Sequence, residues 1–422
     1  MTSEPLRVDF ERLKSDILRL AGIGRTADQG IYRMAFSDGD MAGRAWLRGR
    51  IEQAGLGFHQ DGAANLHARL DWDEQTPSVM TGSHIDTVPG AGHLDGALGV
   101  LCGLEALRVL KEQGVVLQRP LELVAFSDEE GRFGGMFGSQ ALTGDISPEW
   151  IHQARDLDGV TLVEAMAAQG LDAMEALSAA RPPQSLHAFV EMHIEQGPIL
   201  DREGVPIGVV EGICGLQRWE VTFEGTPNHA GTTPMNMRND AFGGLAEFGS
   251  EIDRVLEEHG GPQSVATIGR IELLPGAANV VPGEVRFALE FRDIDAEVLA
   301  ELADAFIRTL AAIARRRKLM FKFEVLSEID PVACDPAIRK LIAEGAERLE
   351  LPHHSLPSGA AHDTQKLARI TRAGMIFVPS KAGRSHSAAE WTAWSDIEAG
   401  ANLLLHTLYQ LATEPSPETP HE

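Results

Sequence analysis

Thr81-Gly-Ser-His-Ile-Asp-Thr-Val-Pro-Gly-Ala-Gly-His-Leu-Asp-Gly96 is the stretch around which the rest of the sequence is arranged. It follows a short apolar run and precedes a helical pattern over 97–113, so we expect a buried strand, a loop and a helix. The loop carries His84, Asp86 and Asp95. An imidazole and carboxylates at the end of a buried strand suit a divalent metal. An acidic surface loop with an isolated histidine remains the alternative at this point.

The same alternation of strand and helix recurs along the chain. The apolar run 121–127 ends in Asp128-Glu-Glu-Gly131, and a second run, 187–194, ends in His193-Ile-Glu-Gln-Gly-Pro198. The pattern returns after Pro336 with a strand over 374–378. Strands followed by helices predict an α/β fold with a mostly parallel sheet covered by helices. Ligands bind such sheets beyond the carboxyl ends of the strands, where these polar loops lie.

The middle of the chain has a different pattern. Its order of strands and helices is β-α-β-β-α-β, which predicts a ferredoxin-like domain. We expect this domain over 213–327, inserted into a discontinuous catalytic domain made of 1–212 and 328–422. The six elements of the inserted domain are expected over 217–224, 240–259, 264–273, 284–292, 295–318 and 320–326.

The composition excludes several classes of protein. The 422 residues include 37 basic and 62 acidic side chains, a net charge of −25, which disfavours binding to nucleic acid and to anionic membranes. There is no apolar run of about 18 residues for a membrane span, and the N-terminal residues do not read as a signal sequence. Cys102, Cys214 and Cys334 lie far apart in no metal-binding pattern. We therefore expect a cytoplasmic protein whose partner is a small molecule.

Candidate metal ligands gather at the predicted strand ends. A hydrogen-bonded polar side chain explains each one alone, but together they converge on one edge of the predicted sheet. A two-metal site needs a carboxylate that bridges the ions, and Asp95 is the natural bridge. The candidates are His84, Asp95, Glu129, Glu130, His193, His362, Asp363 and His386.

Asp86 and the adjacent Glu129 and Glu130 suggest a division of roles around this site. Asp86, two residues after His84, could accept the second N–H of the imidazole. Glu129 and Glu130 are neighbours, and neighbouring side chains of a strand point to opposite sides. One of the pair can then bind metal while the other acts as general base. The alternative is two solvated acids at a turn.

Other catalytic chemistries lack their motifs. The sequence has no Gly-x-Ser-x-Gly nucleophile elbow, no P-loop and no dinucleotide-binding fingerprint. His193-Ile-Glu195 lacks the downstream Cys-x-x-Cys of a zinc deaminase.

Several motifs resemble those of the M20 metallopeptidase and aminoacylase superfamily. Others are similar to its hydantoinase/carbamoylase branch, which contains N-carbamoyl-L-amino-acid hydrolases, β-ureidopropionases and allantoate amidohydrolases. The first group comprises Gly82-Ser-His-Ile-Asp-Thr-Val-Pro89, Leu94-Asp-Gly96 and Asp128-Glu-Glu-Gly131. The second comprises Met192-His-Ile-Glu-Gln-Gly-Pro198, Asn228-His-Ala-Gly-Thr-Thr-Pro-Met235, Asn279-Val-Val-Pro-Gly283 and Ser385-His-Ser387.

The resemblance implies two divalent metal ions per subunit, zinc or manganese, with cobalt and nickel possible. His84, Asp95 and His193 would hold one ion, and Asp95, Glu130 and His386 the other. The resemblance also makes Glu129 the general base.

The resemblance also assigns substrate-binding residues. In the inserted domain, His229 would polarise the scissile carbonyl, and Asn279 and Arg292 would hold a substrate carboxylate, with Gln196 nearby. Gly359 belongs to a further loop expected to contact substrate. Because the inserted domain makes the dimer in this family, a homodimer is expected, in which these residues can reach the neighbouring subunit's metals. The alternatives are a loop-capping role for His229 and a surface ion pair of Arg292 with Asp293 or Asp295.

Two positions depart from the family pattern. Relatives place one residue between the glycine after the Glu pair and Arg-Phe, whereas Gly131-Arg132-Phe133 is contiguous. The loop that starts at Gly359 carries Ala361 where a glycine is common. Both departures lie where substrate selectivity could be set, and neither removes a ligand. His93 has no role in the family pattern, and we expect it outside the ligand set.

The function expected from these features is hydrolysis of a linear amide or ureido C–N bond in a small substrate that bears a carboxylate. An N-carbamoyl-L-amino acid is the first choice, allantoate the second and an N-acyl amino acid the third. A catalytically silent relative that only binds small molecules is the alternative of a different class.

Overall fold

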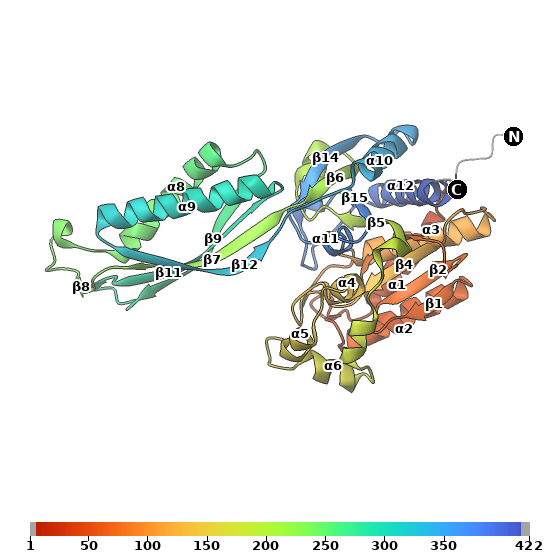
Figure 1. Ribbon diagram of the computed structural model, residues 1–422, viewed down its shortest axis with the longest axis horizontal. Helices are drawn as coiled ribbons and strands as arrows, with labels where there is room; N and C mark the ends of the chain where they lie inside the picture. The colour runs from red at the N-terminus through yellow and green to blue at the C-terminus, as the bar shows by residue number, and fades with distance from the viewer. Residues whose placement is uncertain (1–5, 415–422) are drawn as a thin grey trace, which may run out of the picture. The chain divides into compact units, whose positions relative to one another are not determined.

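The computed structural model describes residues 6–414, which form two compact units (Figure 1). Unit 1 contains the chain up to Glu211 and from Cys334 onward, and unit 2 contains Gly212–Ala333. The domain boundaries expected from the sequence pattern were 212/213 and 327/328. Unit 2 extends a few residues beyond the second of these, to Ala333, and its last strand, Val332–Ala333, pairs with Gly212 and Ile213 at the start of the unit.

A mixed sheet forms the centre of unit 1. Its strand order is β1-β2-β4-β3-β5-β15-β6, and β14 pairs with β6. The four central strands, β4, β3, β5 and β15, are parallel, and the flanking pairs with established register are antiparallel. The predicted parallel core is confirmed. The strands are β1 (Gly57–Gln60), β2 (Leu66–Leu70), β3 (Ser78–His84), β4 (Leu121–Phe126), β5 (Leu186–Ile194), β6 (Ile207–Ile213), β14 (His353–Ser358) and β15 (Arg372–Val378).

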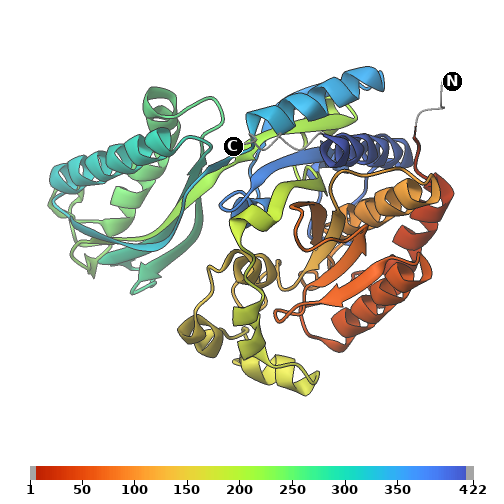
Figure 2. The same ribbon diagram turned by 45° about the vertical axis from the view of Figure 1, so that its right-hand side comes forward.

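Helices cover both faces of this sheet (Figures 1 and 2). α3 and α12 pack on one face, where Val79, Leu123 and Val190 point, and α4 and α11 pack on the other, where Met80 and Phe189 point. Alternate residues of one strand therefore serve two cores, which is why these strands are apolar throughout. The helices are α1 (Phe10–Gly22), α2 (Asp38–Gln53), α3 (Ala97–Glu112), α4 (Phe137–Thr143), α5 (Pro148–Gln153), α6 (Leu162–Ala168), α7 (Ile199–Glu203), α10 (Pro336–Arg348), α11 (Thr364–Leu367) and α12 (Trp394–Thr413).

Unit 2 has the predicted β-α-β-β-α-β order. Its antiparallel sheet has the strand order β12-β7-β11-β9, and α8 and α9 cover one face of it (Figure 2). Phe223, Phe248, Phe287 and Phe306 pack between the sheet and the helices. The elements are β7 (Gly215–Glu224), α8 (Ala241–His259), β9 (Val265–Leu274), β11 (Glu284–Asp293), α9 (Ala296–Arg317) and β12 (Met320–Ile329), with the short strands β8 (Asn228–His229), β10 (Val280–Val281) and β13 (Val332–Ala333).

Two segments differ from the sequence-based expectation. The weakly helical pattern over 164–180 is divided into α6 and a 3₁₀ turn, Ala173–Ser178, because Gly170, with φ of +74°, interrupts it. The strand β1 has only four mostly exposed residues and so carries no apolar pattern. Among residues 6–414, no helix combines the length and apolar character needed to cross a membrane.

Candidate active site

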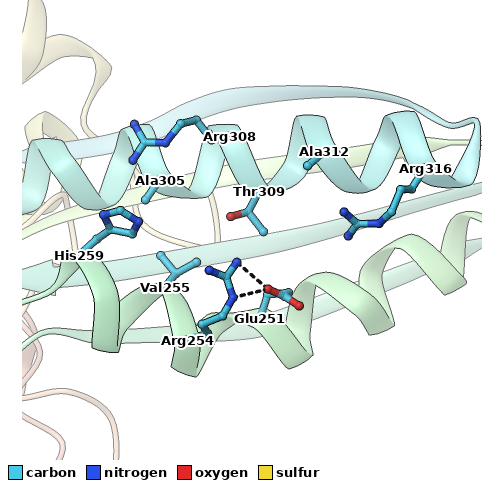
Figure 3. Close-up of a pocket in the computed structure, with 9 residues that line it drawn as sticks. All are labelled: Glu251, Arg254, Val255, His259, Ala305, Arg308, Thr309, Ala312 and Arg316. Atoms are coloured by element: carbon cyan, nitrogen blue, oxygen red, sulfur yellow. Dashed lines mark hydrogen bonds and ion pairs between the residues drawn. The ribbon is translucent and has the colours of Figure 1, made fainter.

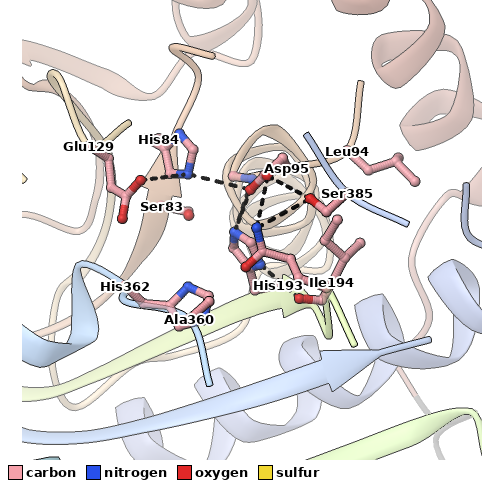
Figure 4. A network of polar contacts seen from close by, with 12 residues as sticks. Ser83, His84, Leu94, Asp95, Glu129, His193, Ile194, Ala360, His362 and Ser385 are labelled. Atoms are coloured by element: carbon pink, nitrogen blue, oxygen red, sulfur yellow. Dashed lines mark hydrogen bonds and ion pairs between the residues drawn. The ribbon is translucent and has the colours of Figure 1, made fainter. Parts of the chain in front are cut away.

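Polar side chains from four segments of unit 1 meet at the carboxyl ends of its parallel strands (Figure 4). β3 supplies His84, and β5 supplies His193. Asp95 lies in the loop before α3, and Glu129 and Glu130 follow β4. Since β3 pairs in parallel with both β4 and β5, these ends lie side by side. His386 joins them from the segment between β15 and α12.

Asp95 lies between two groups of nitrogen ligands. Its Oδ1 is 3.1 Å from Nε2 of His193 and 3.8 Å from Nε2 of His84. Its Oδ2 is 3.2 Å from Nε2 of His386, which is itself 3.5 Å from Oε2 of Glu130. The two oxygens of one carboxylate thus face two different sets of side chains.

Both buried histidines present the same ring nitrogen to Asp95. Nδ1 of His84 is 3.0 Å from the backbone oxygen of Asp86, and Nδ1 of His193 is 2.8 Å from that of Ile194. A carbonyl can only accept, so Nδ1 carries a proton in each ring and Nε2 is the nitrogen that can bind a metal. That is the form in which histidine binds metal.

The side chains suit a pair of divalent ions. Potential ligand atoms of His84, Asp95 and His193 lie within 4.8 Å of one another, as do those of Asp95, Glu130 and His386. Oε1 of Glu130 is buried without a hydrogen-bond partner among the described residues, an arrangement that costs free energy unless something else binds the oxygen. Mixed imidazole and carboxylate ligands match zinc, manganese, cobalt or nickel.

Asp86 supports the site differently from the prediction. Its backbone oxygen, not its carboxylate, orients His84; the carboxylate is 3.9 Å from Nδ1. The carboxylate instead accepts the backbone N–H groups of Glu129 and Glu130 at 3.4 and 3.1 Å. The turn after β4 brings these two amides toward the loop, so Asp86 fixes the position of the Glu pair.

Burial is the main influence on the pKa values of Glu129 and Glu130. Burial, with the nearby Asp363 and Glu130 carboxylates, raises the pKa of Glu129 well above its usual range. Burial also raises the pKa of Glu130, and the Asp95 charge adds to the effect. Oε2 of Glu129 lies 3.5 Å from Nε2 of His84. A carboxyl group with a raised pKa next to a metal site has the proton affinity that a general base requires.

Gln196 and His386 complete the open side of the site. The Gln196 amide donates to Oδ2 of Asp95 at 3.0 Å and to the Ser385 hydroxyl at 3.2 Å. Ser385 in turn donates to the same Asp95 oxygen at 2.9 Å. Gln196 and His386 both have positive φ, +57° and +53°. The His386 side chain is 50% exposed, so this edge of the site is open to solvent.

Glu390 is a supporting residue that the sequence analysis did not identify. Its Oε1 accepts the N–H groups of Leu94 at 2.7 Å and Asp95 at 3.2 Å, and its Oε2 lies 3.2 Å from the Ser385 hydroxyl, whose one proton it shares with Asp95. It thereby joins the Asp95 loop to the His386 segment. Gly92 makes room for it, since a Cβ there would lie 2.3 Å from Oε1 of Glu390. The one signal in the sequence is its position three residues after the Ser385-His-Ser387 motif.

A second buried group lies behind His193. Nε2 of His362 is 2.9 Å from the Ser358 hydroxyl, and the His362 ring contacts that of His193 edge-on at 4.5 Å between centroids. Glu191 also faces this group, but its oxygens accept from Ser83 and Thr364. These residues therefore pack and orient His193. Gly359, in the same loop as His362, is exposed, and a Cβ there would meet nothing within 4 Å.

The candidate residues of unit 2 form two separate groups. His229 and Asn279 lie together, because β8 pairs with β10 and Ala230 donates to the Asn279 backbone oxygen at 2.9 Å. Arg292 lies at the opposite end of β11, about 30 Å of extended strand away. Its guanidinium donates to Oε1 of Glu290, with Nε at 2.9 Å and a terminal nitrogen at 2.7 Å. Within one chain, unit 2 does not bring Arg292 together with Asn279.

Two surface cavities, one in each unit, differ in whether they reach a proposed metal ligand. A groove of about 360 Å³ lies between α8 and α9, but its arginines already contact glutamates, as Arg254 does with Glu251 (Figure 3). A larger cavity of about 650 Å³ lies in unit 1 and reaches Glu130.

His93 lies outside the ligand groups and packs against Trp391, with 5.9 Å between the ring centroids.

Comparisons with known proteins identify a family and several relatives of this chain. The sequence pattern of Peptidase family M20/M25/M40 matches residues 80–410. The N-carbamoyl-L-amino acid amidohydrolase of Geobacillus stearothermophilus is 39% identical over 96% of this chain and 99% of its own. The allantoate amidohydrolase of Escherichia coli is 35% identical over 93% of this chain and 96% of its own. A crystal structure of a hydantoinase/carbamoylase family amidase from Burkholderia multivorans superposes with a TM-score of 0.90, at 37% identity, over 97% of this chain and 100% of that one.

Proposed function

The chain belongs to Peptidase family M20/M25/M40, and on that premise we propose that it is a metal-dependent amidohydrolase that cleaves the ureido C–N bond of an N-carbamoyl-L-amino acid. The observation that carries the proposal is the position of Asp95, whose two oxygens face two separate sets of side chains. A bridging carboxylate of this kind is the central requirement of a two-metal hydrolase.

His84, Asp95 and His193 would hold one divalent ion, and Asp95, Glu130 and His386 a second, zinc or manganese in our proposal. Bound there, the ions would polarise the scissile carbonyl and lower the pKa of water. Glu129 would take the proton of the attacking water and later deliver it to the leaving nitrogen. Asp86 would keep Glu129 in position through its backbone amide.

Three residues of unit 2 are proposed to bind substrate. His229 would stabilise the negative charge on the tetrahedral intermediate. Asn279 and Arg292, which lie far apart within one chain, would bind the substrate carboxylate from different subunits of a dimer. A guanidinium offers a planar pair of donors that suits a carboxylate. Gln196 and Gly359 of unit 1 are proposed substrate contacts as well.

We also propose a homodimer formed through unit 2. β9 lies at one edge of its sheet and exposes Val265 and Ile271, each just over half exposed. The first five residues of β9, Val265–Gly269, carry no charge, whereas the opposite edge strand β12 carries Lys322 and Glu324 among its first five. An uncharged edge strand can pair with a second copy of itself.

Allantoate is the second candidate substrate and an N-acyl amino acid the third. The allantoate amidohydrolase relative supports the second. A catalytically silent protein remains the alternative class, and the full set of His and carboxylate ligands speaks against it.

A substrate screen on metal-reconstituted protein tests the proposal. We expect ammonia release from N-carbamoyl-L-amino acids, loss of activity with EDTA, and recovery with manganese or zinc. Glu129→Gln should lower kcat by about 10²–10⁴-fold. Its metal content should stay the same, because Glu129 is not among the proposed ligands. A reconstituted protein that contains metal but hydrolyses no ureido or acyl amino acid would contradict the proposal.

A further inference from the structure

The cavity in unit 1 that reaches Glu130 has no role in the reaction described above. Its volume of about 650 Å³ falls within the range of roughly 300–1,000 Å³ that is typical of small-molecule sites. It is lined by the segment before α2, the loop after His84, the start of the Glu130–Arg132 loop, and the chain around α6. All of these belong to unit 1.

Apolar side chains line much of the cavity. Met34 and Phe36 contribute from the segment before α2, Val88 and Pro89 from the loop after His84, and Val160 from the segment before α6. Phe36 is buried, whereas Val160 is 37% exposed. Such a lining gains free energy by covering an apolar group, at about 25 cal/mol per Å² removed from water.

The charged groups of the cavity are mostly acidic. Its one cation, Arg132, lies 3.0 Å from Asp156 and donates to the Ala35 backbone oxygen at 2.7 Å, so its charge is already compensated. The carboxylates of Asp38 and Asp158 remain along the wall, and that of Glu164 accepts from Thr161. An anionic group entering the cavity would therefore meet repulsion.

We propose that this cavity binds the side chain of the substrate, and that the substrate class is N-carbamoyl-L-amino acids with a large apolar side chain. The inference rests on the proposed function. In such a substrate the α-carbon is bonded to the nitrogen of the scissile bond, so its side chain starts next to the reacting group. Glu130 belongs both to the proposed ligand set and to the cavity wall. The side chain can therefore enter the cavity while the ureido group lies at the ligands.

The lining of the cavity also favours an N-carbamoyl-L-amino acid with an apolar side chain over allantoate. Allantoate carries a second ureido group at the position of the side chain, and a polar group placed on an apolar lining loses hydrogen bonds to water. An aromatic or long aliphatic side chain has the size and polarity that the lining favours. The contiguous Gly131-Arg132-Phe133 contributes to this preference, because Arg132 is held by Asp156 and does not offer its charge to an anionic substrate.

A bulky substitution that fills the cavity tests the assignment. Ala168 on α6 lines the cavity and is exposed, so a larger side chain there does not disturb the core. Ala167, its neighbour on the same helix, is exposed too but does not line the cavity, which makes Ala167→Trp the matched control. The readout is the ratio of kcat/KM for N-carbamoyl-L-phenylalanine to that for N-carbamoylglycine, which has no side chain.

In the wild type we expect a ratio on the order of 10- to 100-fold in favour of the phenylalanine derivative. Ala168→Trp should bring the ratio close to 1 by raising KM for N-carbamoyl-L-phenylalanine. Ala167→Trp should keep the wild-type ratio. An unchanged ratio in Ala168→Trp, with both substrates hydrolysed, overturns the cavity assignment alone. A protein that hydrolyses neither substrate contradicts the proposed function itself.

A charge substitution provides a second arm. Asp158→Lys should raise kcat/KM for N-carbamoyl-L-aspartate about tenfold relative to N-carbamoylglycine, because it replaces a repulsive charge with an attractive one. Glu74→Lys makes the same change in net charge at an exposed position outside the cavity and should have no such effect. Equal responses of the two variants would contradict a local role for Asp158.

Discussion

At the scale of single residues, the first prediction concerns Glu390, because this residue joins two loops that each carry a proposed ligand. Glu390→Ala removes the acceptor for the Leu94 and Asp95 amides and for Ser385. Loss of such a supporting contact typically lowers metal affinity about 10–100-fold. Glu390→Gln should have a smaller effect, since its amide oxygen still accepts the two backbone N–H groups. The metal content of each variant is measured after dialysis against increasing concentrations of a chelator.

Glu347→Ala, at an exposed position on α10, is the control for that experiment. A circular dichroism melt in EDTA shows whether each variant is folded. If Glu390→Ala, folded, keeps as much metal as Glu347→Ala, the positioning role is wrong.

The candidate ligands could be found from the sequence because a histidine or carboxylate at a strand end is visible one residue at a time. Glu390 could not be found in this way, because its carboxylate accepts hydrogen bonds from backbone amides nearly 300 residues earlier in the chain. The Asp86 prediction shows the same limit: the residue was identified, but which of its oxygens faces His84 depends on the path of the loop.

At the scale of elements, β2 and β4 share a buried charged cluster that makes stability depend on pH. Nε2 of His67 lies 3.3 Å from Asp61, and its Nδ1 lies 3.1 Å from Glu122. Burial opposes a charged imidazole, but the two carboxylates outweigh it and raise the pKa of His67 to about 9 from an ordinary 6.5. The folded protein then holds a proton that the unfolded chain releases near pH 6.5.

This contribution to stability is therefore complete below pH 6.5 and is lost as the pH rises to about 9. Over that window the free energy of unfolding should fall by up to about 1.4 kcal/mol per pH unit. Urea unfolding in EDTA at several pH values measures the slope. His67→Gln should flatten it, whereas His354→Gln, at an exposed position, should not. Equal slopes in wild type and His67→Gln would contradict the prediction.

Helices and strands with a clear hydrophobic period could be predicted from the sequence, and short or exposed ones could not. The strands β3, β4 and β5 and the helices α3, α8 and α9 are found within a few residues of their predicted bounds, because an apolar run or face had to be buried. The strand β1 pairs with β2 but buries little, so only its partner identifies it. Sheet order, which brings β15 next to β5, depends on contacts between residues far apart in the sequence.

At the scale of the whole molecule, the prediction concerns assembly. If the β9 edge forms the dimer, Ile271→Lys should convert it to a monomer, because the substitution places a charge in an apolar strand contact. Val325→Lys on the opposite edge strand, at a similarly exposed position, should leave the dimer intact. Light scattering after size-exclusion chromatography distinguishes the two. A dimer that persists in Ile271→Lys, or is lost only in Val325→Lys, rejects the β9 edge.

The insertion of unit 2 between parts of unit 1 has a consequence for biosynthesis. The ribosome delivers His84, Asp95, Glu130 and His193 well before His386, which follows His193 by 386 − 193 = 193 residues. At about 5–20 residues per second, the wait is on the order of 10–40 s. During it, the growing chain carries several clustered acidic side chains without His386 or the Glu390 contacts. Loading of the second proposed ion, whose ligands include His386, would therefore follow the synthesis of nearly the entire chain.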